Sequence, residues 1–200
     1  AHICTQVGYE DTSTDYATLA QAVVDAGCTS ALLVSYATDG AGIIEELAGL
    51  GYTGAIYGAD GIAEEGLAAG MSDTTLVDGI IATKPAAAGT PGMVAMVFGA
   101  LCAQSTDCAG GIYTAEAFDA VTIVAFAAFT ALATPGLDAG SAVMGTGQGW
   151  NGASGTISFL TNGDVPAAGF CIGEFSTATD GTVSYDCARS WDPVNGITTA

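Results

Sequence analysis

The chain has 200 residues, half of them hydrophobic, so it can form one large domain or two small ones around a sizeable core. Its formal net charge is −19, because Lys84 and Arg189 are the only strong bases against 21 acidic residues. That charge repels phosphate backbones and anionic lipid headgroups, which excludes nucleic-acid binding and binding to a membrane surface.

The first 83 residues alternate between expected strands and helices. The run 30–36 is almost continuously apolar, which is typical of a strand buried on both faces in a parallel sheet. The helix before it places its apolar residues on one face and ends at Gly27. In chain order the expected elements are strand 3–7, helix 13–26, strand 30–36, helix 40–50, strand 55–58, helix 62–69 and strand 77–83.

The second half begins with helices and ends with strands. Helices are expected at 93–103 and 114–133; the apolar run 120–133 is too short for a membrane span and is interpreted as a core helix, so no membrane insertion is expected. Residues 135–152 are rich in Gly, Ala and Ser, and their pattern predicts no particular secondary structure. The last fifty residues are typical of antiparallel β structure, with Asn162-Gly163 as a hairpin turn.

These patterns predict an α/β fold: a parallel sheet flanked by helices, with a C-terminal antiparallel β-hairpin region. The expected divisions are an α/β ligand-binding lobe at 1–112, a helix and a Gly/Ala-rich segment at 113–150, and strands at 151–200 that complete the lobe. No internal repeat of fixed period is found.

Six cysteines in a chain with one lysine favour disulfides, and therefore a periplasmic or extracellular location. None falls in a C-x-x-C pair and His2 is the only histidine, so no zinc or other metal site is expected. Six cysteines permit about fifteen pairings, and buried free thiols are an alternative. Position along the chain favours three pairs, which are Cys102 with Cys108, Cys171 with Cys187, and Cys4 with Cys28.

Two neighbouring strands end in residues that could bind a small ligand. Tyr36 follows the first strand and Asp60 follows the second, and adjacent strand ends are where α/β sheets hold ligands. A carboxylate there can make charge-assisted hydrogen bonds, and a tyrosine ring can pack on a ligand side chain. Alternatively, Asp60 caps the helix that begins near Ile62, and Tyr36 is a core residue at the sheet edge.

Four segments in this order resemble the type I periplasmic solute-binding proteins, in particular the branched-chain amino-acid group. They are TDYATLAQAVVDAG, LLVSYATDGAGIIEELAGLGYTGAIYGADG, TAEAFDAVTIVAFAA and NGASGTISFLTNGDV. The resemblance implies a two-lobed clamshell with a ligand held between the lobes. Family members begin with a lobe-forming segment before the matching region. The chain is therefore expected to be the C-terminal portion of such a protein, and the helix near Phe118 and Asp119 is expected to need other neighbours.

The resemblance also implies roles for individual residues. Asp60 receives the α-ammonium group of the ligand, and Tyr36 lies at the cleft. Ala37 and Thr38 follow in the same loop and could supply backbone N–H groups. Asp39 could do so too, although a solvated turn residue is the favoured interpretation.

Other polar residues are interpreted as structural. Asp15 and Tyr16 match an aspartate–aromatic pair at a helix start in the family, and are read as a cap and a packing residue. Asp119 is given a structural role. Lys84 could pair with a ligand, but a surface salt bridge is the favoured interpretation.

An enzyme is not expected. His2 lies at the terminus, so no Ser–His or Cys–His pair can be built around it. The G-x-S-x-G, P-loop and H-E-x-x-H motifs are absent. The Gly-rich segment 145–149 has no lysine and follows no clear strand, so no cofactor is expected.

Two functions of different classes stay open. The first is a secreted solute-binding protein that captures a small amino acid-like ligand and passes it to an ABC-type permease. The alternative is an extracellular structural or filament-forming subunit that reuses the fold, because an absent first lobe leaves apolar surface for self-association. A sensor ectodomain of the same fold is a third option. Ligand-dependent thermal stability favours the first function, and a ligand-blind oligomer favours the second.

Overall fold

The computed structural model describes residues 2–10, 12–85, 92–105, 108, 113–166 and 169–199. The chain divides into two compact units: unit 1 is Ala1–Pro85 with Phe170–Ala200, and unit 2 is Ala86–Gly169. The expected divisions at 112 and 150 lie inside unit 2, whereas the C-terminal strands join the N-terminal sheet as expected.

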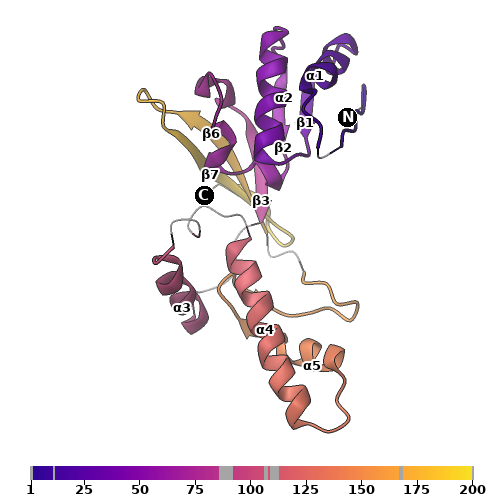
Figure 1. The fold of residues 1–200 in the computed structure, drawn as a ribbon, viewed down its shortest axis with the longest axis vertical. Helices are drawn as coiled ribbons and strands as arrows, with labels where there is room; N and C mark the ends of the chain where they lie inside the picture. The colour runs from indigo at the N-terminus through magenta and orange to yellow at the C-terminus, as the bar shows by residue number, and fades with distance from the viewer. Residues whose placement is uncertain are drawn as a thin grey trace. The chain divides into compact units, whose positions relative to one another are not determined.

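Unit 1 is built on a six-stranded sheet in the order β1-β2-β3-β6-β7-β8 (Figure 1). The strands β1, β2 and β3 are parallel, and each later neighbour in the sheet is antiparallel. Their bounds are β1 Ser30–Leu33, β2 Ala55–Gly58, β3 Ile81–Pro85, β6 Phe170–Thr177, β7 Val183–Asp192 and β8 Gly196–Thr199. The predicted α/β fold with a parallel core and antiparallel C-terminal strands is confirmed.

Two helices of unit 1, α1 (Tyr16–Asp25) and α2 (Ala37–Gly49), pack against each other and supply much of the core. Ile44 and Leu47 of α2 are almost completely buried in the same cluster as Leu33 of β1. Between β2 and β3 the chain forms short 3₁₀ turns and not the expected helix 62–69. These turns are η1 Asp60–Ile62, η2 Glu65–Ala68 and η3 Thr74–Val77, and each buries at least one apolar side chain.

Two expectations for the start of the chain are wrong. Residues 3–7 form no strand. The strand at 30–36 is not buried on both faces: Ala31 and Leu33 are buried, but Leu32 is 68% exposed and Val34 is 75% exposed. These two side chains are therefore largely uncovered in the described chain.

The six cysteines form three disulfides, in the pairs that position along the chain favours. The Cα atoms are 5.9 Å apart in Cys4–Cys28, 5.2 Å apart in Cys102–Cys108 and 5.5 Å apart in Cys171–Cys187. The first of these ties the N-terminal segment to the residues just before β1.

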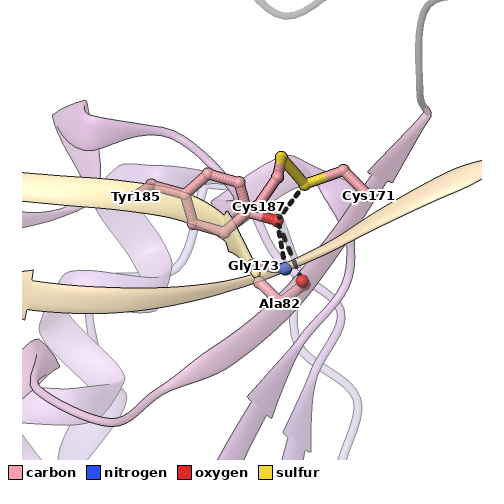
Figure 2. Close-up of a disulfide and its surroundings, with 5 residues drawn as sticks. All are labelled: Ala82, Cys171, Gly173, Tyr185 and Cys187. Carbon is pink, nitrogen blue, oxygen red and sulfur yellow. Dashed lines mark hydrogen bonds between the residues drawn. A yellow bond between two sulfur atoms is a disulfide. The ribbon is translucent and has the colours of Figure 1, made fainter. Parts of the chain in front are cut away.

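The Tyr185 side chain of β7 forms hydrogen bonds to β3 and β6 next to the Cys171–Cys187 disulfide (Figure 2). Its hydroxyl donates to the Ala82 carbonyl of β3 at 2.9 Å and accepts from the Gly173 N–H of β6 at 3.2 Å. The Cys171 sulfur lies 3.6 Å from the same oxygen. Burial raises the pKa of Tyr185, so its hydroxyl stays protonated and available to donate. The antiparallel part of the sheet is thereby joined to the parallel part.

Unit 2 consists of three helices and a two-stranded ribbon in its described part. These are α3 Met93–Cys102, α4 Thr114–Ala133, α5 Ala139–Thr146, β4 Trp150–Asn151 and β5 Thr156–Ile157. Helix α5 lies in the segment 135–152, for which the sequence predicted no secondary structure. Its N-cap, Asp138, accepts hydrogen bonds from the Ser141 N–H and hydroxyl. Asn162-Gly163 lies in a turn closed by the Leu160 N–H and the Asp164 carbonyl, but no strands flank it, so the hairpin predicted there is wrong.

Asp119 of α4 is completely buried and organises the ribbon of unit 2. Its carboxylate accepts from the Ala153 N–H at 2.7 Å, from the Ser154 N–H at 2.8 Å and from the Ser154 hydroxyl at 2.7 Å; the Trp150 indole lies at 3.5 Å. A Cβ atom at Gly152 would collide with this carboxylate, so only glycine fits there. These contacts agree with the structural role predicted for Asp119.

Helix α4 lies at the expected residues, 114–133. It begins at Thr114, spans 20 residues and is apolar enough to cross a membrane by length and composition alone. Only 17% of its most apolar window is buried, and Val121, Phe129 and Leu132 are each more than 70% exposed. The interpretation of this segment as a core helix is therefore wrong.

Candidate functional site

The strands β1 and β2 end side by side. They pair in parallel with Leu33 opposite Gly58, and the Ala59 N–H extends the ladder by donating to the Leu33 carbonyl at 2.9 Å. Both segments therefore leave the sheet at the same edge, as parallel strands must. Tyr36 then caps α2 and Asp60 begins η1, so the two predicted ligand contacts follow directly from adjacent strand ends.

The loops that carry Tyr36 and Asp60 touch each other. A Cβ atom placed on Gly61 would run into the Ser35 carbonyl oxygen and would lie 3.5 Å from Cδ1 of Tyr36. Glycine is therefore required at this position, next to Asp60. The Tyr36 side chain is 76% exposed and Asp60 is half-buried, so the ring is accessible and is not the core tyrosine of the alternative interpretation.

The first turn of α2 provides backbone donors at the same edge. Ala37 and Thr38 are its first residues, and their N–H groups precede the first intrahelical hydrogen bond. Tyr36 makes no side-chain capping bond. The positive end of a 13-residue helix dipole therefore lies beside the Asp60 loop.

Asp39 holds this turn in place, and sequence reasoning missed its role. The Tyr16 hydroxyl donates to Oδ1 of Asp39 at 2.7 Å, and the Tyr9 hydroxyl donates to Oδ2 at 3.2 Å. The bond to Asp39 raises the pKa of Tyr16, while burial and then the charge of Asp39 raise the pKa of Tyr9. Asp39 thus joins α2 to the start of α1 and to the segment before it, and is not a solvated turn residue.

The remaining polar candidates have local partners. Asp15 caps α1 by accepting from the Thr18 N–H and hydroxyl, and these bonds lower the pKa of Asp15. The Lys84 ammonium lies 4.7 Å from the centroid of the Tyr185 ring, a cation–π contact. Among the described residues, no group of three or more His, Cys, Asp or Glu side chains could hold a metal ion.

No protein-family description matches the chain, and no curated protein matches its sequence. Solved structures do share its fold. A leucine-binding protein, LivK, from Thermotoga maritima has a TM-score of 0.71 at 21% identity over 94% of this chain and 52% of its own. A solute-binding protein of an ABC transporter from R. palustris, in complex with 4-hydroxybenzoate, has a TM-score of 0.70 at 14% identity over 93% of this chain and 51% of its own.

A third similar structure is the branched-chain amino-acid binding protein LivJ from Streptococcus pneumoniae, in complex with isoleucine. Its TM-score is 0.61 at 17% identity, over 88% of this chain and 49% of its own. The chain therefore spans about half the length of these solved structures. At such low identity the likeness establishes the fold alone, which the chain shares with about half the length of each of these solute-binding proteins. These similar structures are binding proteins. Three disulfides are typical of proteins in oxidising compartments.

Proposed function

We propose that the chain forms part of an extracytoplasmic solute-binding protein and contributes one wall of a site for a small amino acid-like solute. The observation that carries this proposal is the contact between the Tyr36 and Asp60 loops at adjacent ends of parallel strands. The shared fold of the solute-binding proteins supports it.

The edge of the sheet offers complementary groups to a zwitterion. The Asp60 carboxylate would accept charge-assisted hydrogen bonds from an ammonium group. The N–H groups of Ala37 and Thr38, at the positive end of α2, would donate to a carboxylate. The exposed ring of Tyr36 would pack on the apolar part of the solute.

Binding would be coupled to transport through a shape change. In this proposal the opposite wall of the site comes from polypeptide outside unit 1, and the solute stabilises the closed arrangement of the walls. The closed form would deliver the solute to a permease of the ABC type. No cofactor is needed for this function.

Titration with L-leucine tests the proposal, because a similar solved structure is a leucine-binding protein. Leucine should raise the Tm, since a ligand that binds only the folded state stabilises it. Asp60→Asn should weaken the affinity measured by calorimetry at least about tenfold, which corresponds to loss of one charge-assisted bond of about 1.4 kcal/mol. Asp78→Asn, at an exposed position outside the site, is the matched control. Leucine, isoleucine and 4-hydroxybenzoate all leaving the wild-type Tm unchanged would refute the proposal, as would an Asp60→Asn affinity equal to that of wild type.

One observation favours a second function, that of an assembly subunit. Helices α3 and α4 expose apolar side chains, among them Met93, Met96, Phe129 and Leu132, each at least 66% exposed. Exposed apolar side chains that gather into a patch mark protein–protein contacts. A stable oligomer whose Tm does not change when any of the three solutes is added would favour this function over solute binding.

A further inference from the structure

Residues 2–9 form an N-terminal strap that is attached to unit 1 through side chains. Within the described chain they lie in no helix or strand, and no backbone hydrogen bond joins them to other residues. The Cys4–Cys28 disulfide holds one part of the strap. The Tyr9 hydroxyl holds its end by donating to Oδ2 of Asp39 at 3.2 Å.

The Cys4–Cys28 disulfide is accessible to a thiol from solvent, because Cys4 is exposed and Cys28 is half-buried. Near Cys4, Ile3 and Val7 are 77% and 39% exposed, so apolar burial adds little to hold this part of the strap. Once the disulfide opens, two cysteines that are 24 residues apart can therefore separate. The chain entropy gained by this separation favours the reduced form.

The other two disulfides join cysteines that stay close together when reduced. Cys171 is 5% exposed, and the β6–β7 ladder continues on both sides of it and of Cys187. Cys102 and Cys108 are half-buried and only 6 residues apart. Thiols that the fold or a short loop keeps together re-form their disulfide readily, so these two bonds resist a reductant that opens the strap.

The Tyr9 end of the strap reaches the first turn of α2. Asp39 lies in that turn, and its other carboxylate oxygen accepts from the Tyr16 hydroxyl at 2.7 Å. Opening the disulfide removes the link that restrains the chain before Tyr9, so the bond from Tyr9 to Asp39 is broken for more of the time. The first turn of α2 then depends on Tyr16 alone for this anchor.

We propose that the Cys4–Cys28 disulfide is a redox-sensitive switch that sets, through Tyr9 and Asp39, how firmly the first turn of α2 is held. A small dithiol supplies the two electrons. One of its thiolates attacks a sulfur of the disulfide, which breaks the S–S bond and forms a mixed disulfide. Its second thiolate then displaces the protein sulfur. The dithiol becomes a cyclic disulfide, and its two protons pass to Cys4 and Cys28, which end as thiols.

Titration with dithiothreitol tests the order of reduction in the folded chain. Free thiols are alkylated at each step and located by mass spectrometry. Cys4 and Cys28 should be alkylated at a dithiothreitol concentration about tenfold below that needed for the other four cysteines. Alkylation of another pair first, or of all six cysteines together, would overturn the proposal.

Amide hydrogen exchange tests the link to α2. Exchange at residues 40–43, whose N–H groups make the first hydrogen bonds of the helix, should be about fivefold faster in the selectively reduced chain, the effect of losing one hydrogen bond. Tyr9→Phe should give the same increase with the disulfide intact. Reduction of that variant should then add little, because both changes remove the same bond.

Cys102→Ser/Cys108→Ser, in the other unit, is the control and should leave exchange at residues 40–43 unchanged. Unchanged exchange after reduction of the wild type would overturn the proposal. An equal increase in the control variant, or additive effects of reduction and Tyr9→Phe, would overturn it as well.

The switch should also act on solute affinity, and this part rests on the proposed function. Ala37 and Thr38 begin the same turn, and their N–H groups are the proposed donors to the solute carboxylate. Reduction should therefore weaken leucine binding in calorimetry by about fivefold. Equal affinity in both forms would contradict control of the site by the strap. Absence of leucine binding in both forms would count against the proposed function, while hydrogen exchange still decides the switch.

Discussion

At the scale of single residues, Asp119 shows how one carboxylate can order a segment distant in sequence. It is fully buried, and its acceptors are used by Ala153 and Ser154, 34 and 35 residues further along the chain. Donors converge on both oxygens, so a neutral amide in its place would set an N–H₂ group against N–H and O–H donors.

Asp119→Asn is therefore expected to lower the free energy of unfolding of unit 2 by about 3 kcal/mol, the cost of losing charge-assisted bonds in a buried site. Urea unfolding monitored by tryptophan fluorescence measures this change, since Trp150 lies at the same site. Glu116→Gln, in the same helix, is the control. Equal urea midpoints for the two variants would show that the charge of the buried carboxylate does not contribute to the stability of unit 2.

Glu45 of α2 predicts a pH dependence whose sign can be worked out. Its carboxylate accepts from the Ser72 N–H and hydroxyl, both at 2.7 Å, and these bonds lower its pKa below the ordinary value of 4.5. A lowered pKa in the folded state gives stability that is present above pH 4.5 and is lost as the pH falls through the folded value.

Glu45→Gln should therefore lower the Tm at pH 7, and the difference from wild type should shrink as the pH falls below about 4.5. Calorimetric scans over this range make the comparison, with Glu46→Gln on the exposed side of the same helix as control. A difference that stays constant with pH would mean that the charge of Glu45 is not its cause.

At the scale of elements, the Cys171–Cys187 disulfide closes the β6–β7 pair. It joins cysteines 16 residues apart, and a loop of that length predicts about 3 kcal/mol of stabilisation through the unfolded chain. The double variant Cys171→Ala/Cys187→Ala should lose about that amount in urea unfolding. The Cys102–Cys108 pair is separated by 6 residues, so the corresponding double variant should lose less, about 2 kcal/mol. The reverse order would exclude loop length as the deciding quantity.

Elements with strong periodic signals were predicted well from sequence. Helices α1, α2 and α4 and strands β1 and β2 lie close to their expected positions, because periodic apolar residues and turn residues mark them. The strand expected at 77–83 is displaced to Ile81–Pro85, since Thr74–Val77 form the turn η3. The helix expected at 62–69 became 3₁₀ turns, since Ile62 and Leu67 each anchor a separate turn in the core. Periodicity could not reveal that Leu32 and Val34 are exposed, because exposure depends on what the fold places beside them.

The location of the candidate site was predictable, because the direction of parallel strands determines which loops lie at the same edge of the sheet. Parallel pairing of β1 and β2 brings the loops of Tyr36 and Asp60 to one edge, as the sequence pattern implied. The role of Asp39 was not predictable, because its partners Tyr9 and Tyr16 lie 30 and 23 residues away in the sequence and no local motif indicates these hydrogen bonds. Whether these residues contact a ligand stays a prediction.

At the scale of the whole molecule, strong charge and exposed apolar surface oppose each other. A net charge of −19 keeps copies apart at low ionic strength, while Phe129 and Leu132 of α4 remain open to contact. Raising NaCl from about 0.02 to about 1 M shortens the Debye length and should increase self-association in sedimentation velocity. Phe129→Ser should reduce this increase, and Val194→Ser, on unit 1, should not. Self-association that does not change with the NaCl concentration, or that Phe129→Ser leaves unchanged, would contradict the claim that charge repulsion opposes apolar contact through α4.

The pairing of β3 with β6 has one more consequence. Pro85 and Phe170 are partners in the antiparallel register, so the backbone departs from the sheet and re-enters it at one spot. Everything in between is an insertion at the tip of what would otherwise be a hairpin. A gene in which a two-residue turn replaced that insertion would still encode every strand of the sheet in its present alignment. Evolution can therefore lengthen, trim or exchange the inserted module without rebuilding the scaffold that carries it.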